Sequence, residues 1–208
     1  MLKFKTSRGV TLIELMVGLT IMAFLLLSGA PSLTEWIRNS QIRSAAESIM
    51  TGLHHARTEA VKRNSSARFQ LTSTLDNDCA VDTSGKNWVV NLGASNTPAG
   101  NCGDATSDTV APLMVQKSVA STSTGITVTA SQGVVSFNGL GQQTPASNPT
   151  ATVGTMTIDV TSSSGACLSS DGSGSFRCLR IVVSPAGQAR MCDPSMGTNA
   201  SNAQPTAC

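Results

Sequence analysis

One acidic side chain, Glu14, lies inside a long apolar run near the start of this 208-residue chain. From Val10 to Ala30 it is the only ionisable side chain. Placing a charge at the depth of a lipid bilayer is costly, so such residues are generally functional and have a partner. The chemistry that Glu14 offers is therefore ion pairing with a cation in an apolar medium.

Other groups that could do chemistry are few. His54 and His55 are consecutive on an expected helix, so their side chains point about 100° apart and do not readily bind one ion. Asp76, Asp78 and Asp82 offer the oxygen ligands that calcium prefers, but they lack EF-hand spacing, and a solvated acidic loop is the simpler interpretation. No Cys-x-x-Cys pair, phosphate-binding glycine loop or nucleophile elbow occurs. We predict no enzyme and no metal or cofactor site.

The apolar run is the element that must position Glu14. Residues 10–30 supply about the 20 apolar residues that a helix needs to cross a bilayer. Lys3, Lys5 and Arg8 precede them, which predicts a cytoplasmic N-terminus and an exported remainder. A cleaved secretory signal peptide is the alternative, but its apolar region is only about 7–15 residues long. A plain stop-transfer anchor is another, although it would not need the acid.

Six cysteines all follow the apolar run and therefore belong to the exported part of the chain. An even number in an oxidising compartment indicates disulfides, although six cysteines permit many connectivities. We expect sequential pairing, because each bridge then closes a short loop in a Gly- and Ser-rich segment and restricts the unfolded chain. The expected bridges are Cys79–Cys102, Cys167–Cys178 and Cys192–Cys208.

One continuous helix should run from the apolar segment into the exported region. Beyond Pro31, apolar residues recur at three- and four-residue spacings as far as Val61, which is typical of an amphipathic helix. The polar cluster Asn64-Ser65-Ser66 should end this helix. Since an interior proline removes a backbone hydrogen bond, Pro31 should kink it.

Residues 65–208 should form one β-rich head domain. Short alternating or β-branched runs are separated by Gly, Asn, Ser and Pro clusters, as in antiparallel sheets. The expected strands are 67–71, 88–92, 126–130, 134–137, 153–160, 179–183 and 188–192, with a turn at 184–187. The expected fold class is α+β: a long N-terminal helix, transmembrane in its first half (10–30), whose second half (31–64) packs on an antiparallel, sandwich-like head.

The first residues of the apolar run resemble a known processing signal. Gly9 followed by Val-Thr-Leu-Ile-Glu-Leu resembles the class III signal of type IV pilins and type II secretion pseudopilins. The resemblance implies the pilin fold, a leader over residues 1–9, cleavage between Gly9 and Val10 by a prepilin peptidase, and methylation of Val10. The first mature residue of this family is usually Phe or Met, whereas here it is Val. Pro31 stands where these families carry a helix-bending proline.

Cleavage would create an ammonium at Val10, four residues before Glu14. The resemblance implies that Glu14 pairs with the N-terminal amine of an adjacent subunit and so sets axial register during assembly. Opposite charges offset each other's desolvation only in good geometry, which a neighbouring subunit would supply. The alternative is that Glu14 pairs with its own amine or lies at the lipid headgroups.

The residues at the end of the expected helix resemble one particular group within this family. Segments 48–63 and 68–71, which include Ala-Arg-Thr-Glu-Ala at 56–60, resemble the GspH/FimT/FimU group of minor pilins and pseudopilins. The charges of Arg57 and Glu59 should diverge on the helix and serve structure. The group implies a structural subunit that helps to initiate or cap a type IV pilus, and a GspH-type pseudopilin of the type II secretion system is the alternative.

The same resemblance implies the partners and the location of the protein. The partners are other minor pilins and the major pilin, or the corresponding pseudopilins, together with the prepilin peptidase and the inner-membrane assembly platform. The protein would be a single-pass protein of the bacterial inner membrane, with a cytoplasmic N-terminus and a periplasmic head, before it enters a filament.

DNA is a further candidate partner. Some FimT proteins that resemble this chain take up DNA through a Gly-Arg-x-Arg element, and the matching residues 187–190 are Gly-Gln-Ala-Arg, so only Arg190 carries over. Arg177 and Arg180 are the other candidates near the tail. Without the three basic residues of the leader, 11 basic residues face 12 acidic ones. Because phosphate-binding surfaces need clustered Lys and Arg, DNA is the less favoured partner.

We predict that the mature protein begins at a methylated Val10. Intact-mass measurement of the protein purified from its membrane or filament should give the mass of residues 10–208 with three disulfides and one methyl group. In a strain without prepilin peptidase, the full leader should remain. Finding Met1 on the protein in assembled filaments would contradict the prediction.

Overall fold

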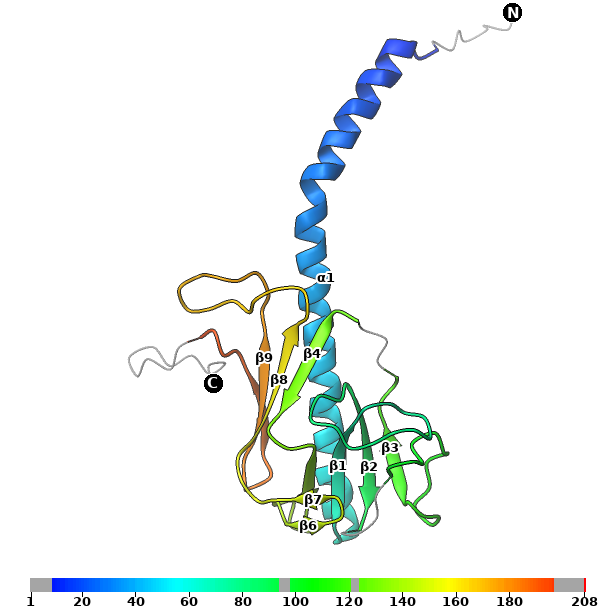
Figure 1. Ribbon diagram of the computed structural model, residues 1–208, viewed down its shortest axis with the longest axis vertical. Helices are drawn as coiled ribbons and strands as arrows, with labels where there is room; N and C mark the ends of the chain where they lie inside the picture. The colour runs from blue at the N-terminus through cyan, green and yellow to red at the C-terminus, as the bar shows by residue number, and fades with distance from the viewer. Residues whose placement is uncertain (1–8, 94–97, 121–123, 197–207) are drawn as a thin grey trace, which may run out of the picture. The chain divides into compact units, whose positions relative to one another are not determined.

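The computed structural model describes residues 9–93, 98–120, 124–196 and 208, apart from the side chains of residues 27–32. The chain forms two compact units, Met1–Ile37 and Arg38–Cys208. One helix, α1 (Leu12–Arg63), begins in the first unit and ends in the second (Figure 1). All of the described strands belong to the second unit, together with the part of α1 from Arg38 onward.

Helix α1 ends where the polar cluster predicts. Asn64 follows its last residue and adopts a left-handed backbone conformation with φ of 46°, which is a common way to terminate a helix. The backbone N–H of Ser65 then donates to the carbonyl of Ala60 at 3.1 Å. The helix continues through Pro31, whose side chain lies outside the described residues, so the kink remains a prediction.

The membrane-spanning helix predicted over residues 10–30 also remains a prediction. Among the residues that the structure describes, no helix is both long enough and apolar enough to cross a bilayer. Residues 27–30 of the expected span have side chains outside that described set.

Two four-stranded antiparallel sheets and one short hairpin make up the strands of the head. One sheet has the order β3-β2-β1-β5, the other has the order β10-β9-β8-β4, and β6 pairs with β7. The expected α+β fold class, with a long N-terminal helix on antiparallel sheets, is thereby confirmed. The strands are β1 (Ala67–Thr72), β2 (Asn87–Leu92), β3 (Met114–Lys117), β4 (Ile126–Ala130), β5 (Val134–Phe137), β6 (Ala146–Ser147), β7 (Thr150–Ala151), β8 (Met156–Ser162), β9 (Leu179–Val183) and β10 (Ala189–Cys192).

Several strands differ from the expected ones at their ends, and three were missed. Strand β8 begins at Met156 and not at 153, because Val153 is half exposed and the next residue, Gly154, lies in a bend. The sequence pattern missed β6 and β7, which have only two residues each, and β3, in which only Met114 is fully buried. The β9–β10 hairpin closes through Ser184 N–H donating to the carbonyl of Gln188, so its loop is 185–187.

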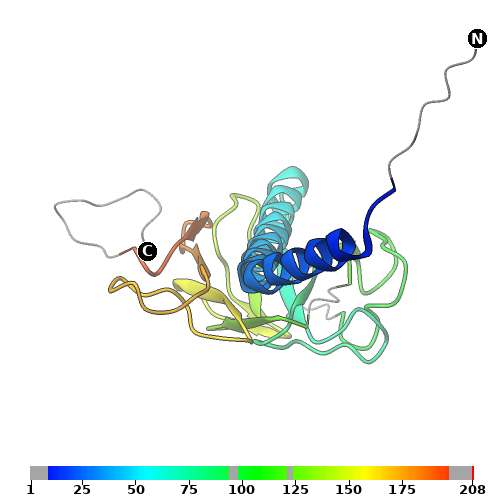
Figure 2. The same ribbon diagram turned by 90° about the horizontal axis from the view of Figure 1, so that it is seen from above.

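One stripe of α1 forms the centre of the core. Its buried residues follow a repeat of four and three positions, which places them on one face of a helix. Seen from above, the part of α1 that belongs to the head lies on one side of the strands (Figure 2). Buried apolar side chains of both four-stranded sheets pack against it in a single cluster. The helix residues of the stripe are Ile42, Ala46, Ile49, Leu53, Ala56 and Ala60.

Gly52 allows α1 to approach an aromatic pair closely. A Cβ atom at this position would lie 2.6 Å from Cδ2 of Trp88 and 2.8 Å from Cε2 of Phe69. The Trp88 indole N–H donates to Oγ of Ser48 at 3.1 Å, which fixes the ring against the helix. A larger residue at position 52 would therefore separate the helix from the sheet.

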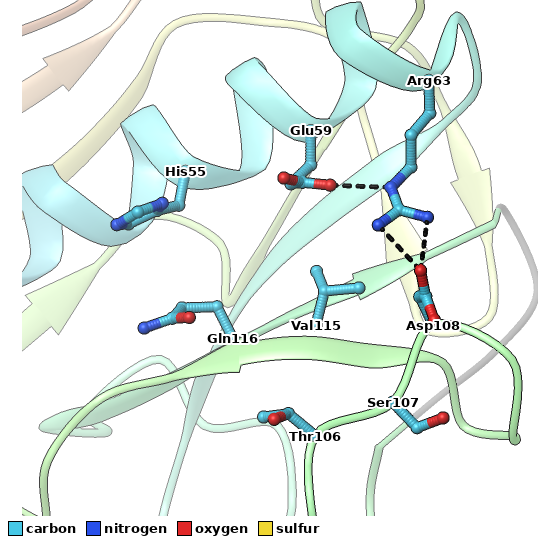
Figure 3. A pocket seen from close by; sticks show the side chains of 8 residues that line it. All are labelled: His55, Glu59, Arg63, Thr106, Ser107, Asp108, Val115 and Gln116. Atoms are coloured by element: carbon cyan, nitrogen blue, oxygen red, sulfur yellow. Dashed lines mark hydrogen bonds and ion pairs between the residues drawn. The ribbon is translucent and has the colours of Figure 1, made fainter.

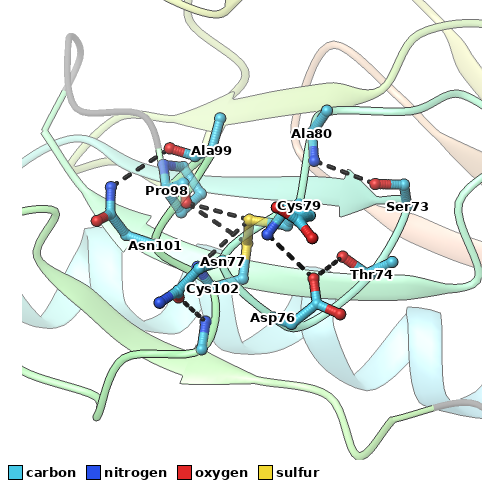
Figure 4. The surroundings of a disulfide bond; sticks show 12 residues. Ser73, Thr74, Asp76, Asn77, Cys79, Ala80, Pro98, Ala99, Asn101 and Cys102 are labelled. Carbon is cyan, nitrogen blue, oxygen red and sulfur yellow. Dashed lines mark hydrogen bonds between the residues drawn. A yellow bond between two sulfur atoms is a disulfide. The ribbon is translucent and has the colours of Figure 1, made fainter.

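Three disulfides connect the irregular segments of the head, in the sequential pattern that the spacing predicts: Cys79–Cys102, Cys167–Cys178 and Cys192–Cys208. The first joins two loops, and both of its cysteines are buried (Figure 4). The loop closed by the second is also held to α1, because the Arg177 N–H donates to Oδ1 of Asn39 at 2.8 Å. The bridges thus fix segments that have little regular structure.

We predict that Gly52→Ala destabilises the head by about 1–3 kcal/mol, the usual cost of overpacking. Helix propensity alone would give the opposite sign, since alanine is favoured over glycine by about 1 kcal/mol inside a helix. Gly154→Ala is the control, because a Cβ atom there meets nothing within 4 Å. Thermal unfolding of the full chain in detergent measures both, and a more stable Gly52→Ala variant would refute the packing argument.

Candidate functional site

The start of α1 carries the residues that resemblance assigns to processing and assembly. Gly9 and Val10 precede the helix and are exposed, so the expected cleavage site is accessible. Glu14 lies in the first turn, where its backbone N–H donates to Oγ1 of Thr11 at 3.3 Å, a capping contact. Residues 1–8 of the expected leader lie outside the described residues.

Glu14 is surrounded by exposed apolar side chains. Leu12 and Ile13 are 79% and 71% exposed, and Leu15, Met16 and the apolar residues that follow are exposed too. No ion pair within the described residues includes the Glu14 carboxylate. A helix that is apolar on all sides is normally buried in a membrane or among other helices. This segment therefore has the surface expected of a helix that contacts lipid or other helices.

A polar hollow of about 290 Å³ lies in the head, between the last turns of α1 and strand β3 (Figure 3). Figure 3 shows the helix side chains on one wall and the segment before β3 on the other. The lining residues are His55, Glu59, Arg63, Thr106, Ser107, Asp108, Val115 and Gln116.

Arg63 connects the two walls of this hollow. Its Nε donates to Oε2 of Glu59 at 2.7 Å, and its two terminal nitrogens each donate to Oδ2 of Asp108 at 3.2 Å. The Arg63 hydrogen bond lowers the pKa of Glu59, and the carboxylates raise the pKa of Arg63. Lys62 lies 3.5 Å from Glu59. This cluster fastens a loop to the helix end, which is a structural role.

Arg57 and Glu59 serve different neighbours, in agreement with the expected divergence of their side chains. Glu59 pairs with Lys62 and Arg63, whereas Arg57 Nε donates to the carbonyl of Gly141 at 3.0 Å. The contacts of Arg57 with Gly141 and of Arg63 with Asp108 join residues 84 and 45 positions apart. No local sequence pattern predicts these two contacts, whereas the spacing of four residues predicts the Glu59–Arg63 pair on a helix.

The candidate DNA contacts do not form one basic cluster. Arg180 Nε and Nη2 donate to the two carboxylate oxygens of Asp159 at 2.6 and 3.0 Å, which raises the pKa of Arg180, and the Asp159 carboxylate balances its charge. Arg177 is exposed in the loop before β9, and Arg190 is exposed on β10. Arg190 lines a second hollow together with Arg57.

The expected acidic loop is built from local turns. Oδ1 of Asp76 accepts hydrogen bonds from the Thr74 hydroxyl at 2.6 Å and from the Asp78 N–H at 3.1 Å, and the Thr74 bond lowers the pKa of Asp76. Oδ1 of Asp82 accepts hydrogen bonds from Ser84. In the described part of the chain, no three His, Cys, Asp or Glu residues are placed to hold a metal ion. His54 and His55 are both exposed.

Comparison with known families gives two matches. A family model described as "Type II transport protein GspH" matches residues 45–187. A second, described as "Prokaryotic N-terminal methylation motif", matches residues 4–30. The first covers most of the head and the end of α1, and the second covers the expected leader and apolar run.

Comparison with solved structures finds two crystal forms of the type IV minor pilin FimU from Pseudomonas aeruginosa strain PAO1. The first is 19% identical and covers 80% of this chain and 99% of that chain, with a TM-score of 0.45. The second is 18% identical and covers 81% of this chain and 96% of that chain, also with a TM-score of 0.45. No curated protein sequence matches this chain significantly.

We predict that Glu59→Gln lowers the melting temperature of the full chain at pH 7. Because the folded-state pKa of Glu59 lies below its ordinary value of 4.5, the carboxylate stabilises the fold above that value, and its contribution is lost as the pH falls through the lowered pKa. The difference between variant and wild type should therefore shrink with acidification.

Glu47→Gln provides the matched control for this prediction. Glu47 also pairs with an arginine four residues away on α1, Arg43, but the two side chains are 56% and 75% exposed. Exposed pairs of this kind contribute little, so this variant should melt near the wild-type temperature. An equal loss in both variants, or a pH-independent loss in Glu59→Gln, would disprove the role assigned to Glu59.

Proposed function

Since the chain belongs to the type II transport protein GspH family, we propose that it is a minor pilin that helps to initiate or cap a type IV pilus. Members of this group are structural subunits, and the methylation motif at residues 4–30 fits a pilin or pseudopilin anchored in the membrane. The observation that carries the proposal is the single acid, Glu14, in an exposed apolar helix.

The N-terminal segment would act in two stages. Before assembly, residues 10–30 hold the protein in the inner membrane as a single-pass helix, with the head in the periplasm, and prepilin peptidase removes residues 1–9. After cleavage and methylation, the ammonium at Val10 is available to a neighbouring subunit. Because burial of apolar surface has no preferred register along a helix, a directional contact is needed to fix how far one subunit rises above the next.

Glu14 supplies that directional contact. Its carboxylate has no ion-pair partner within the described residues, and an uncompensated charge in an apolar filament core is costly. Pairing with the Val10 ammonium of an adjacent subunit satisfies both charges at one axial offset. The partners of the protein are then the other minor pilins and the major pilin, with the assembly platform driving their addition.

The role of the head is mechanical and not catalytic. Its core is anchored to α1, and three disulfides hold its loops. Such a head suits a subunit that must survive export and present a fixed surface to neighbouring heads. Because the charge of Arg180 is balanced by the Asp159 carboxylate, we do not assign DNA uptake as the main role.

A pseudopilin of the type II secretion system is the alternative, since the same N-terminal features serve both machines. Deleting the gene separates the two. Under our proposal surface pili are reduced while protein secretion continues. Loss of secretion with intact pili would assign the protein to the secretion system instead.

We predict that Glu14→Ala strongly reduces entry of the protein into filaments without blocking its processing. Without the carboxylate, the Val10 ammonium of the neighbouring subunit has no partner in the apolar core, so incorporation should fall by at least about tenfold, the equivalent of 1.4 kcal/mol. The measurement compares the subunit in sheared filaments with the subunit in the membrane.

Glu35→Ala is the control for this experiment, because Glu35 is an exposed acid on the same helix beyond the apolar run. It should enter filaments at the wild-type level. Normal incorporation of Glu14→Ala would overturn the register role of the acid.

A further inference from the structure

A second hollow, of about 430 Å³, opens between α1 and the β9–β10 hairpin. Its lining contains two guanidinium groups and no carboxylate. The remaining polar groups are hydroxyl and amide side chains, which can donate hydrogen bonds to an anion. The lining residues are Arg57, Val182, Ser184, Gln188, Ala189 and Arg190.

Both arginines of this hollow retain unused donors. Arg57 is half-buried and donates only its Nε to the carbonyl of Gly141, at 3.0 Å. Arg190 is exposed. In the described part of the chain, neither guanidinium pairs with a carboxylate, in contrast to Arg180, which is held by Asp159. The hollow therefore offers positive charge that no carboxylate among the described residues compensates.

The shape of the hollow depends on a close contact between two glycines. Gly187 has φ of 78°, and a Cβ atom there would lie 1.9 Å from the carbonyl oxygen of Gly141. The same oxygen accepts the Arg57 hydrogen bond. The carbonyl of Gly141 thus contacts both the hairpin loop and Arg57 of the helix. This contact holds the Arg57 side chain in position in the absence of a ligand.

Strand β10 lies at the edge of its sheet beside this hollow. The N–H of Ser184 donates to the carbonyl of Gln188. In an antiparallel pair of strands, every second residue directs its N–H and C=O toward the partner strand, so those of Ala189 and Met191 point away from β9. Among the described residues, no strand pairs with this side of β10. A strand edge of this kind can pair with an extended segment by β-strand addition.

We propose that this hollow and the β10 edge bind an extended acidic segment of a neighbouring pilin-type subunit, whose carboxylate is held by Arg57 and Arg190. The proposal rests on the proposed role as a filament subunit. Arginine forks bind carboxylates through paired, charge-assisted hydrogen bonds, and the β10 edge would bind the backbone of the same segment. The contact is directional and selects for charge, unlike the packing of apolar helices.

The observations favour a protein segment over nucleic acid. A polyanion needs several clustered cations, whereas this site supplies two, and from residue 69 onward the chain has five basic and eight acidic residues. A strand edge also matches a peptide backbone and has no counterpart on a nucleic acid. A single carboxylate on an extended chain fits both features.

The test uses the full chain in detergent micelles and a fluorescent octapeptide of alternating Glu and Val. Fluorescence anisotropy should detect salt-sensitive binding of this peptide and none of the matching Gln-Val peptide. Arg190→Gln and Arg57→Gln should each weaken binding by about tenfold or more, as expected for loss of a charge-assisted contact. Arg177→Gln is the matched control, an exposed arginine outside the hollow, and should bind as the wild type does.

Arg190→Gln is the deciding variant, because the Arg190 side chain makes no hydrogen bond to the described residues, whereas Arg57→Gln removes the contact with Gly141. Equal binding of the Glu-Val and Gln-Val peptides, or wild-type binding by Arg190→Gln, would overturn the proposal. So would tighter, Arg190-dependent binding of a single-stranded oligonucleotide, which would identify a nucleic-acid site. These outcomes are independent of whether Glu14→Ala enters filaments, so the two proposals fail separately.

Discussion

The structure of the head depends on the burial of one stripe of α1 against two separate sheets. In the described residues, β3-β2-β1-β5 and β10-β9-β8-β4 are hydrogen-bonded within themselves and not to each other. The apolar cluster around Ile49 and Leu53 contains residues of both sheets. Since each fully buried Leu or Ile contributes about 1.5–3 kcal/mol, the helix is what joins the two sheets into one domain.

This dependence explains the residue types on the stripe. Half of the stripe is alanine, at positions 46, 56 and 60, and Gly52 lies against Trp88, so the helix can approach the sheets closely. Aromatic residues make up only 3% of the chain, and the Phe69–Trp88 pair packs where Gly52 leaves room for it. Away from the helix the head is rich in loops, and there the disulfides restrict the chain in place of apolar burial.

The parts of the fold that the sequence predicted are those encoded locally. The spacing of the stripe gave α1, the polar cluster at 64–66 gave its end, and alternation gave strands such as β4 and β9. Strands β6 and β7 have two residues each, too few for a pattern to exceed chance, and β3 has only one fully buried residue, Met114, in place of an apolar run. The contacts of Arg57 with Gly141 and of Arg63 with Asp108 depend on how distant loops fold back, which no local pattern contains.

Under the proposed function, the start of α1 sets the register between subunits, and the end of α1 contributes to the choice of the neighbouring subunit. Apolar helix packing is strong but has no direction, and one ion pair from Glu14 fixes register without distinguishing one pilin-type neighbour from another. Selection of a particular neighbour therefore has to come from the head. Arg57 and Arg190 suit that task, because a guanidinium fork requires both a charge and an orientation from its partner. The carbonyl of Gly141 holds the Arg57 guanidinium in place. Arg57 follows Ala56 of the buried stripe, so the helix that organises the core of the head also carries one of the two groups that would select the partner.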